Sequence, residues 1–427
     1  MNFLRTYRIE ILIFVVSLGV HLASFAVAVN VAGGDVLSVV RADDGFYELA
    51  ANVRAGNGFS WSTEAPYAPN PLRTPGFSYT LALLLGLGVT GAALVQLVFG
   101  SAIPLFCMVI ARMITNSKAI GVIAGIVLAL DPTLAILSFQ FYSDTLFLLL
   151  FLPWLILTLR YFERWDAVTL VASAILMGAA ILVRPVVQYL PFLIMLGILW
   201  HFRREWRRAV MHSGVYLIVI CAILAPWVMR NQEVFGTPGL SAQSSFILYT
   251  NLAPAVLSVA TGVDFLEERA AFLTEAEYKG DAITLANGGE YTKRALEVVL
   301  AHPLPTAWVV GKSLFTFFTN DGFYAFLARI GYEPNNFLPF LIVMRLVWIA
   351  VTLAAFVGAL VYVRRERSLR TILVLFLVAY FALTSAATAF GTNPRYRLPV
   401  DPIIIALAAI GTSAALSYRN RTLPEGR

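Results

Sequence analysis

Residues 9–31 read IEILIFVVSLGVHLASFAVAVNV, and the stretch Arg41-Ala-Asp43-Asp44-Gly-Phe-Tyr47 follows a short way along the chain. The first stretch is long enough to cross a bilayer, because a hydrocarbon core of about 30 Å takes about 20 apolar residues in a helix. A pair of carboxylates just outside a bilayer is costly to keep without a role. The sequence therefore predicts that the first outer loop carries the chemistry, and that the rest of the chain holds this loop at the membrane surface.

The composition of the whole chain is that of a membrane protein. Of its 427 residues, 59% are hydrophobic and 13% are charged, whereas a soluble domain carries roughly 25% charged residues. The apolar runs are continuous rather than alternating, which favours helices over a closed barrel. The predicted fold class is an all-α polytopic membrane protein with about 10–12 transmembrane helices, in one domain that spans residues 1–427.

Charge and cysteine content argue against several other classes. The formal net charge of +6 does not indicate nucleic-acid binding, because the arginines lie between apolar runs. Cys107 and Cys221 lie within apolar segments, so no disulfide framework is predicted. The four histidines lack the spacing of metal ligands. The N-terminal run with Ala26-Val-Ala28 is similar to a cleaved signal peptide, but its length favours an uncleaved first span.

Ten segments have the length and hydropathy of spanning helices. They are residues 9–31, 91–112, 119–137, 145–160, 167–183, 186–201, 209–229, 341–363, 371–390 and 399–418. With the N-terminus inside, the basic clusters that contain Arg5, Arg112, Arg160, Arg203, Arg364 and Arg419 all fall on the cytoplasmic side, as the positive-inside rule expects. This arrangement requires that residues 75–89 and 305–319 form interfacial or re-entrant helices. If both cross the membrane, only the middle of the chain inverts.

Two polar regions then face outward, residues 32–90 and residues 230–340. The second is expected to be mostly helical, because charged residues alternate with alanine and leucine over Asp264–Leu300. A turn is expected within it at Asn287-Gly-Gly289.

A short amphipathic helix is expected over residues 43–55. Its apolar residues fall on one helical face; they are Phe46, Leu49, Ala50 and Val53. Asp43 or Asp44 can cap its start and Gly56 or Gly58 can end it, and such a helix is expected to lie on the membrane surface. One cap needs only one side chain, so the other aspartate is available to act as a base towards a hydroxyl that arrives from water.

Ten short motifs follow one another along the chain. They are Asp43-Asp44, Gly56-Asn-Gly58-Phe59, Arg73-Thr-Pro75-Gly76, Asp131-Pro132, Ser143-Asp144, Arg184-Pro185, Pro226-Trp227, Arg230-Asn231, His302-Pro303 and Arg395-Tyr396-Arg397. In order and predicted sidedness this series resembles the GT-C superfamily of membrane glycosyltransferases. The most similar branch holds the bacterial relatives of protein O-mannosyltransferases and the lipid A aminoarabinose transferase. That transferase has Lys-Pro-Pro where this chain has Arg73-Thr-Pro75, so the sugar and the acceptor stay open.

The resemblance implies an enzyme that moves a sugar from a polyprenyl-phosphate donor to a glycan, lipid or protein acceptor. It implies base-assisted inverting transfer on the periplasmic side of a bacterial inner membrane, with both termini cytoplasmic. Asp43 is the candidate base, and Asp44 is expected to orient the base or the acceptor. The residues expected to bind substrate, with arginines that can hold phosphate oxygens bidentately, are Tyr47, Arg73, Asp144, Arg184, Arg230, Lys312, Arg395 and Arg397.

Simpler roles are available for some of these cations. Arg184 and Arg230 lie at predicted helix ends, where a long cationic side chain can act as an anchor. One of Arg395 and Arg397 can pair with Asp401.

No metal or other cofactor is expected. The alternative is a hard divalent cation held by oxygen ligands from Asp43, Asp44 and Asp144.

Two other functions suit a helical membrane protein with basic outer residues. One is a transporter or flippase for a lipid-linked sugar, which should carry ionisable residues at mid-membrane and internal symmetry. The sequence has few such residues and no internal repeat. The other is a polymerase or ligase that transfers whole glycans, which is expected to carry its catalytic arginines in a large outer loop.

Overall fold

The computed structural model describes residues 7–278, 283–391 and 393–422, and within them every regular element is a helix. Arg5 lies outside the described residues, and the side chain of Arg419 is not described. The helices of the main bundle are α2 (Arg8–Val31), α6 (Gly88–Thr115), α7 (Lys118–Ala129), α9 (Asp144–Arg164), α10 (Ala167–Val183), α11 (Leu190–His201), α12 (Trp206–Phe235), α19 (Leu338–Arg365), α20 (Leu369–Ala386) and α21 (Asp401–Thr422).

Shorter helices connect those of the bundle. They are α3 (Val36–Val40), α4 (Phe46–Ala55), α5 (Pro75–Leu84), α8 (Pro132–Leu137), α13 (Gln243–Ile247), α14 (Ala253–Thr261), α15 (Phe265–Tyr278), α16 (Gly288–Ala301), α17 (Pro303–Thr319) and α18 (Phe323–Arg329). Single turns of 3₁₀-helix form η1 (Leu85–Leu87), η2 (Pro185–Val187), η4 (Pro334–Phe337), η5 (Ala389–Gly391) and η6 (Pro394–Tyr396), and a π-helical turn forms η3 (Leu248–Leu252).

The predicted all-α polytopic architecture is confirmed. In the described part of the chain, seven helical segments are long and apolar enough to cross a membrane: Arg8–Val31, Pro75–Thr115, Asp144–Arg164, Trp206–Phe235, Gln243–Thr261, Pro334–Arg365 and Leu369–Ala386. Four shorter apolar helices accompany them, at Lys118–Ala129, Ala167–Val183, Pro185–His201 and Asp401–Ser417. Each of the ten predicted segments overlaps a helix, but four differ in their bounds. Asp131 divides residues 119–137 into α7 and α8, and a turn divides residues 186–201 into η2 and α11. Helix α20 ends at Ala386, before the predicted residue 390, and α21 begins at Asp401, after the predicted residue 399. The segment Gln243–Thr261 was not predicted as a span.

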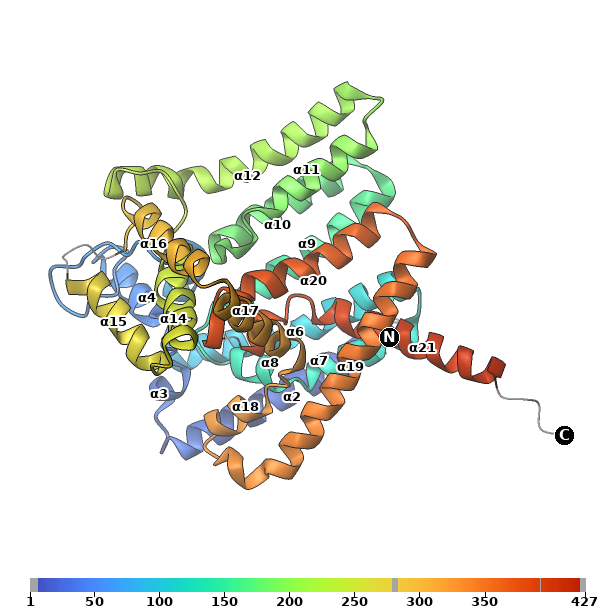
Figure 1. Cartoon of the computed structure of the whole chain (residues 1–427), viewed down its shortest axis with the longest axis horizontal. Helices are drawn as coiled ribbons and strands as arrows, with labels where there is room; N and C mark the ends of the chain where they lie inside the picture. The colour runs from blue at the N-terminus through green and yellow to red at the C-terminus, as the bar shows by residue number, and fades with distance from the viewer. Residues whose placement is uncertain (1–6, 279–282, 392, 423–427) are drawn as a thin grey trace.

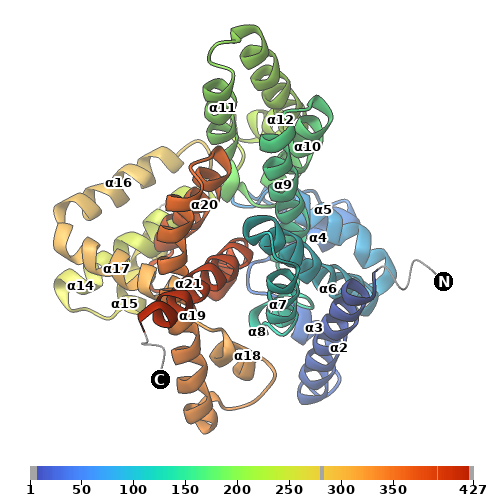
Figure 2. The same cartoon turned by 90° about the vertical axis from the view of Figure 1, so that its right-hand side faces the viewer.

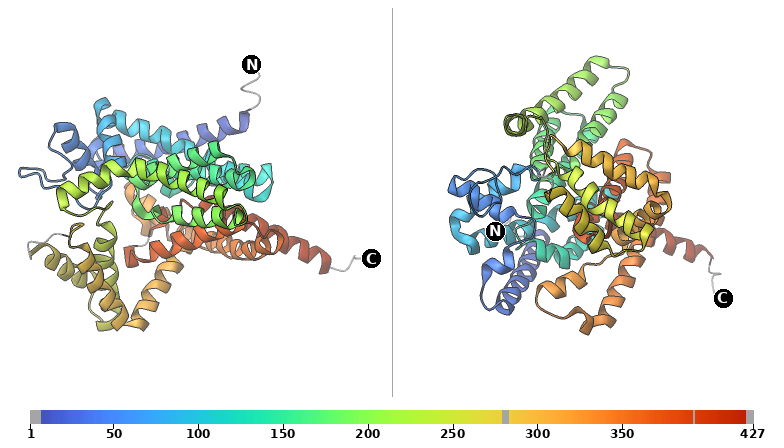
Figure 3. Two further views of the ribbon diagram at one scale, coloured as in Figure 1. Left: turned by 90° about the horizontal axis from the view of Figure 1, so that it is seen from above. Right: turned by 60° about the vertical axis from the view of Figure 1, so that its left-hand side comes forward.

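The turns that carry the basic clusters gather at one end of the bundle. In Figure 1 the α9–α10, α11–α12 and α19–α20 turns lie on the right, together with the start of α2 and the end of α21. Arg370 ties this end together, because it lies 2.5 Å from Glu163 and donates to the Met113 carbonyl at 3.1 Å. Helices α4 and α14–α16 lie at the opposite end (Figures 1 and 3). The basic clusters therefore share one end, as the predicted arrangement requires.

Helix α21 occupies the middle of the bundle. Seen from the basic end, α19 and α20 lie to one side of it and α6, α7 and α9 to the other (Figure 2). Residues 400–408 at its start are all buried. Its contact with α19 is close enough that a Cβ atom on Gly358 would overlap the Leu407 carbonyl, and one on Gly411 would overlap the Ala354 carbonyl. Small residues permit this approach between helices in a membrane.

Two segments of undecided topology are helical. Residues 75–89 comprise α5, η1 and the start of α6, and Gly88 at the junction has a positive φ of 78°. Gly76 brings α5 against the Leu182 carbonyl at the end of α10. Residues 305–319 lie in α17, which packs against α14 and α20. Whether either segment crosses the membrane stays a prediction.

The predicted helical region over Asp264–Leu300 is present as α15 and α16. They are separated by residues 279–287, of which 279–282 lie outside the described residues. The predicted turn at Asn287-Gly-Gly289 is displaced: residues 285–287 form the turn, Asn287 is the N-cap of α16, and both glycines are the first residues of this helix.

Replacing Gly358 by leucine should lower the midpoint of thermal unfolding of the purified protein in detergent. The added side chain would collide with the backbone of α21, and overpacking of a close contact costs about 1–3 kcal/mol. Gly214→Leu in α12 is the control, because a Cβ atom there meets nothing within 4 Å. Equal midpoints for the two variants would contradict the packing described for α19 and α21.

Candidate active site

Asp44 joins distant parts of the chain. Its Oδ1 accepts from Arg73 Nη2 at 3.4 Å and its Oδ2 from Arg395 Nη1 at 3.3 Å. Arg73 also donates from Nε to the Asp44 carbonyl at 3.1 Å and from Nη1 to Gln243 Oε1 at 3.2 Å. The loop after α2, the segment before α5, the start of α13 and η6 are therefore held together at one carboxylate.

A second carboxylate–arginine pair lies beside the first. Asp144, the first residue of α9, is buried and accepts from Nη1 of Arg184, which follows the last residue of α10. The Tyr396 ring connects the two pairs, because the guanidinium carbons of Arg184 and Arg395 lie 5.8 and 5.0 Å from its centroid. Arg395 Nη2 also donates to the Tyr396 hydroxyl at 3.0 Å. Two carboxylates and three arginines of the predicted site thus meet in one cluster.

The charges of this cluster keep Asp44 ionised. Burial raises the pKa of its carboxyl group, but the guanidiniums of Arg395, Arg73 and Arg184 outweigh burial and leave the pKa below its usual value. Three guanidiniums face the two carboxylates of Asp44 and Asp144, so the cluster retains positive charge. Fixed guanidinium charge of this kind suits a phosphate or another oxyanion.

Asp43 differs from its neighbour because it is free. Its side chain is exposed and makes no hydrogen bond or ion pair with any residue that the structure describes. It lies near Tyr142: burial raises the pKa of the Tyr142 hydroxyl, Arg395 opposes this shift, and the charges of Asp44 and Asp43 add to it. Asp43 is therefore an exposed carboxylate beside the fixed cations of the cluster, without a partner among the described residues.

A polar cavity of about 120 Å³ adjoins the cluster, between α8, α18 and η6. Its polar lining residues are Thr133, Gln140, Tyr142, Arg329, Asn393 and Arg395. With its amide oxygen turned towards Arg329, Gln140 accepts from Nε at 2.7 Å and from Nη2 at 3.2 Å. Arg395 faces both this cavity and Asp44, so a group bound in the cavity would lie next to the carboxylate–arginine cluster.

The helix after Asp44 begins later than predicted. Helix α4 starts at Phe46, and its N-cap is Gly45 in the left-handed conformation (φ 73°), without a side-chain cap. A Cβ atom at Gly45 would collide with the Trp61 ring, so the turn requires glycine. The prediction that Asp43 or Asp44 caps this helix is wrong, and both carboxylates are released for other contacts.

The apolar face of α4 was predicted to lie on the membrane surface, but it packs inside the protein, where Phe46, Leu49 and Ala50 are buried. Phe46 meets Phe77 of α5 edge to face, with ring centroids 5.1 Å apart. The Arg73 guanidinium lies 5.0 Å from the centroid of the Phe46 ring. Gly56 ends the helix as predicted. Helices α4 and α5 therefore form a packed base that positions Asp44 and Arg73.

Arg230 and Lys312 are not part of the cluster. The Arg230 guanidinium lies 4.8 Å from the centroid of the Trp227 ring, where it supports the end of α12. Lys312 is exposed on α17, with Nζ 4.5 Å from the centroid of the Phe390 ring. The anchor role considered for Arg230 agrees with its position.

The buried guanidinium of Arg397 is bound by other groups of the protein. It is 1% exposed, and its Nε donates to Asp401 Oδ1 at 2.7 Å. Its Nη1 donates to the carbonyls of Phe317 at 2.9 Å and Asn320 at 2.7 Å, at the end of α17. The expectation that one of the two neighbouring arginines pairs with Asp401 is confirmed. The prediction that Arg397 binds substrate does not fit a guanidinium so fully used by protein groups.

Several residues of the site were missed by sequence reasoning. Tyr142 precedes the motif Ser143-Asp144 and Tyr396 lies within the motif Arg395-Tyr396-Arg397, so their positions in the sequence are a usable signal. Arg329 and Gln243 have no sequence signal, because only the fold brings α18 and α13 to the cavity and to Arg73. The predicted residue Tyr47 stacks on Phe141, the neighbour of Tyr142, with centroids 6.3 Å apart.

Within the described residues, no group of three or more histidine, cysteine, aspartate or glutamate side chains could hold a metal ion. Asp44 and Asp144 are each bound to arginine instead. A cation site shared by Asp43, Asp44 and Asp144 is therefore not preformed in this arrangement.

Residues 71–229 match the family model described as dolichyl-phosphate-mannose-protein mannosyltransferase. The matched segment contains Arg73, Asp144 and Arg184, and it confirms the predicted resemblance to a GT-C-like glycosyltransferase. No curated protein sequence matches the chain.

Among solved structures, the chain is similar to the archaeal oligosaccharyltransferase AglB from Archaeoglobus fulgidus in complex with an inhibitory peptide and a dolichol-phosphate. The TM-score is 0.49 at 15% identity, over 96% of this chain and 52% of that one. A crystal structure of the Archaeoglobus fulgidus oligosaccharyltransferase with Zn and sulfate gives a TM-score of 0.48 at 17% identity, over 94% and 50%. The chain therefore spans about half the length of these structures.

Asp44→Asn should lower the thermal midpoint at neutral pH and have a smaller effect in acid. Because the pKa of Asp44 is lowered in the folded protein, its charge adds stability that is complete above the ordinary aspartate pKa and is lost as the pH falls through the folded value. The measurement is the midpoint difference between wild type and variant across an acid titration. Asp35→Asn is the control, because Asp35 caps α3 and asparagine caps equally well. A gap that does not close in acid would contradict the charge-based role.

Arg397→Met should destabilise the fold more than Arg395→Met. The first change leaves Asp401 buried and uncompensated, which costs about 3–5 kcal/mol. The second change leaves Asp44 still paired with Arg73, and the Asp44 side chain is 25% exposed to solvent. Yield of folded protein and thermal midpoint measure the difference, and a greater loss for Arg395→Met would reverse the assigned roles.

Proposed function

We propose that the protein is a membrane glycosyltransferase that moves a sugar from a polyprenyl-phosphate donor to a glycan, lipid or protein acceptor. The observation that carries the proposal is the free carboxylate of Asp43 beside the positively charged cluster around Asp44. The family match over residues 71–229 supports the same reaction class. The arrangement meets both needs of the transfer, a base for the acceptor and fixed cations for the leaving phosphate.

The arginines are suited to the leaving group. When the bond between the anomeric carbon and the phosphate oxygen breaks, the electron pair leaves with the phosphate and negative charge develops there. Arg395 faces the cavity, and its Nε has no hydrogen-bond partner among the described residues. Preorganised donors of this kind stabilise charge at little cost in reorganisation. Arg73 and Arg184 add positive charge on the same side.

Asp43 is the proposed base. The acceptor hydroxyl gives its proton to the Asp43 carboxylate while its oxygen forms the new bond to the anomeric carbon. A single displacement of the phosphate inverts the configuration at that carbon. Because Asp44 is bound to Arg73 and Arg395, its proposed task is to position these arginines and not to take the proton.

The other cluster residues complete the proposed site. Asp144 fixes Arg184 at the end of α10, and the ring of Tyr47 offers a stacking surface near Tyr142 for a sugar. The proposed mechanism takes its positive charge from guanidiniums and assigns no step to a metal.

The orientation is also a proposal. The basic turns would face the cytoplasm, in accord with the positive-inside rule, together with both termini. The Asp44 end would then face the periplasm of a bacterium, with the chain in the inner membrane. In this orientation a lipid-borne donor reaches the site sideways from the bilayer.

Asp43→Asn should reduce sugar transfer by about a hundredfold or more, because general base catalysis contributes factors of this size. The substitution keeps the shape of an exposed side chain that has no hydrogen bond or ion pair with the described residues, so the amount of folded protein should not change. The assay is transfer from radiolabelled polyprenyl-phosphate sugars in membranes that contain wild type or variant.

Asp35→Asn, in the same loop, is the matched control and should transfer at the wild-type rate. Equal transfer by wild type and Asp43→Asn would remove Asp43 as the base. Absence of transfer by the wild type from every donor tested would contradict the proposed function itself.

A further inference from the structure

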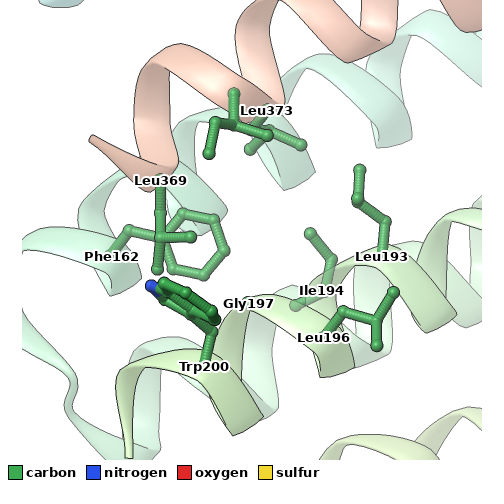
Figure 4. Close-up of a pocket in the computed structure, with 9 residues that line it drawn as sticks. Phe162, Leu193, Ile194, Leu196, Gly197, Trp200, Leu369 and Leu373 are labelled. Atoms are coloured by element: carbon green, nitrogen blue, oxygen red, sulfur yellow. The ribbon is translucent and has the colours of Figure 1, made fainter. Parts of the chain in front are cut away.

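An apolar pocket of about 220 Å³ lies at the end of the bundle opposite Asp44, between α9, α11 and α20. Figure 4 shows Phe162, Leu369 and Trp200 grouped at one side of it, with Leu193, Ile194 and Leu196 at the other. None of these residues takes part in the proposed reaction.

The pocket has a buried floor and an exposed rim. Ile194 is 0% exposed and Leu373 is 2% exposed, whereas Leu196 and Trp200 on the rim are 63% and 65% exposed. Gly197 leaves open the space next to the Phe162 ring, because a Cβ atom at this position would lie 3.2 Å from that ring. Since the lining is apolar and these helices are apolar segments of a membrane protein, the pocket suits the chain of a lipid.

Positive charge without an acidic partner lies at the mouth of this pocket. The Arg203 guanidinium lies 5.1 Å from the centroid of the Trp200 ring and donates to the Trp200 carbonyl at 3.1 Å. Arg204 follows it and is exposed. Glu205 is already bound to Arg208 at 2.8 Å. Among the described residues, neither Arg203 nor Arg204 is paired with a carboxylate.

We propose that the pocket and these two arginines bind one anionic phospholipid. An acyl chain of the lipid lies between Trp200 and Leu373, and its phosphate is held by Arg203 and Arg204. Trp200 joins the apolar pocket to Arg203, and tryptophan is favoured at the boundary between hydrocarbon and headgroups. A net negative headgroup complements two unpaired guanidiniums, whereas a zwitterionic headgroup brings a cation of its own. The site does not depend on the proposed sugar transfer.

The test is native mass spectrometry of the full chain in detergent with added phosphatidylglycerol or phosphatidylcholine. Wild type should retain one phosphatidylglycerol and little phosphatidylcholine. Arg203→Gln and Arg204→Gln should each weaken retention about fivefold, the contribution of one arginine near an anionic surface. Leu196→Trp should obstruct the rim and weaken retention about tenfold, because lost burial of even two methylene groups has this effect.

Two variants serve as matched controls. Phe192→Trp enlarges another exposed side chain of α11 that does not line the pocket, and the double variant Glu205→Gln with Arg208→Gln removes a neighbouring ion pair without changing the net charge. Neither should change retention. Equal retention of the two phospholipids would overturn the proposal. So would unchanged retention in the Arg203, Arg204 and Leu196 variants, or displacement of phosphatidylglycerol by an equal amount of polyprenyl phosphate.

Discussion

A partly buried carboxylate must be paired with positive charge, and Asp44 meets this constraint by drawing distant segments together. Arg73 precedes α5 and Arg395 precedes α21, yet both bind one carboxyl group. Removing a carboxylate from water costs free energy that only close cations and hydrogen bonds offset. The position of the first loop, of α5 and of the segment before α21 is therefore tied to a single ionised group. The same pairing leaves Asp43 unbound beside them.

The sequence predicted the helices better than their contacts. Hydropathy located the spanning segments because each long apolar run must satisfy its own backbone in lipid. It did not select Gln243–Thr261, which is a candidate by length and composition and whose mean hydropathy of 1.2 is the lowest among the seven. The aspartate pair and Arg73, Asp144, Arg184 and Arg395 were predicted as site residues and do meet in space. Local pattern sufficed for these because each stands at the end of an apolar run on the same side of the bundle.

Errors arose where tertiary contact decides between local alternatives. An aspartate before an amphipathic stretch is a good helix cap, but the Trp61 ring against Gly45 sets a different turn and releases both carboxylates. Arg395 and Arg397 are indistinguishable by sequence. Only the carbonyls at the end of α17 and the buried Asp401 show that Arg397 belongs to the fold. The hydrophobic pattern of α4 likewise does not reveal whether its partner is lipid or α5.

Arg395 lies in the short turn η6 and Arg397 directly follows it, yet the two arginines bind different parts of the protein. Arg397 is fastened to the last carbonyls of α17, while Arg395, two residues earlier, holds Asp44. A displacement of α17 along its axis would pull on η6 and alter the distance between Arg395 and Asp44. Helix α17 continues almost directly from α16. The carbonyls at the end of α17 are thus linked through residues 395–397 to the carboxylate of Asp44 in the first loop, although α17 and this loop are far apart in the chain.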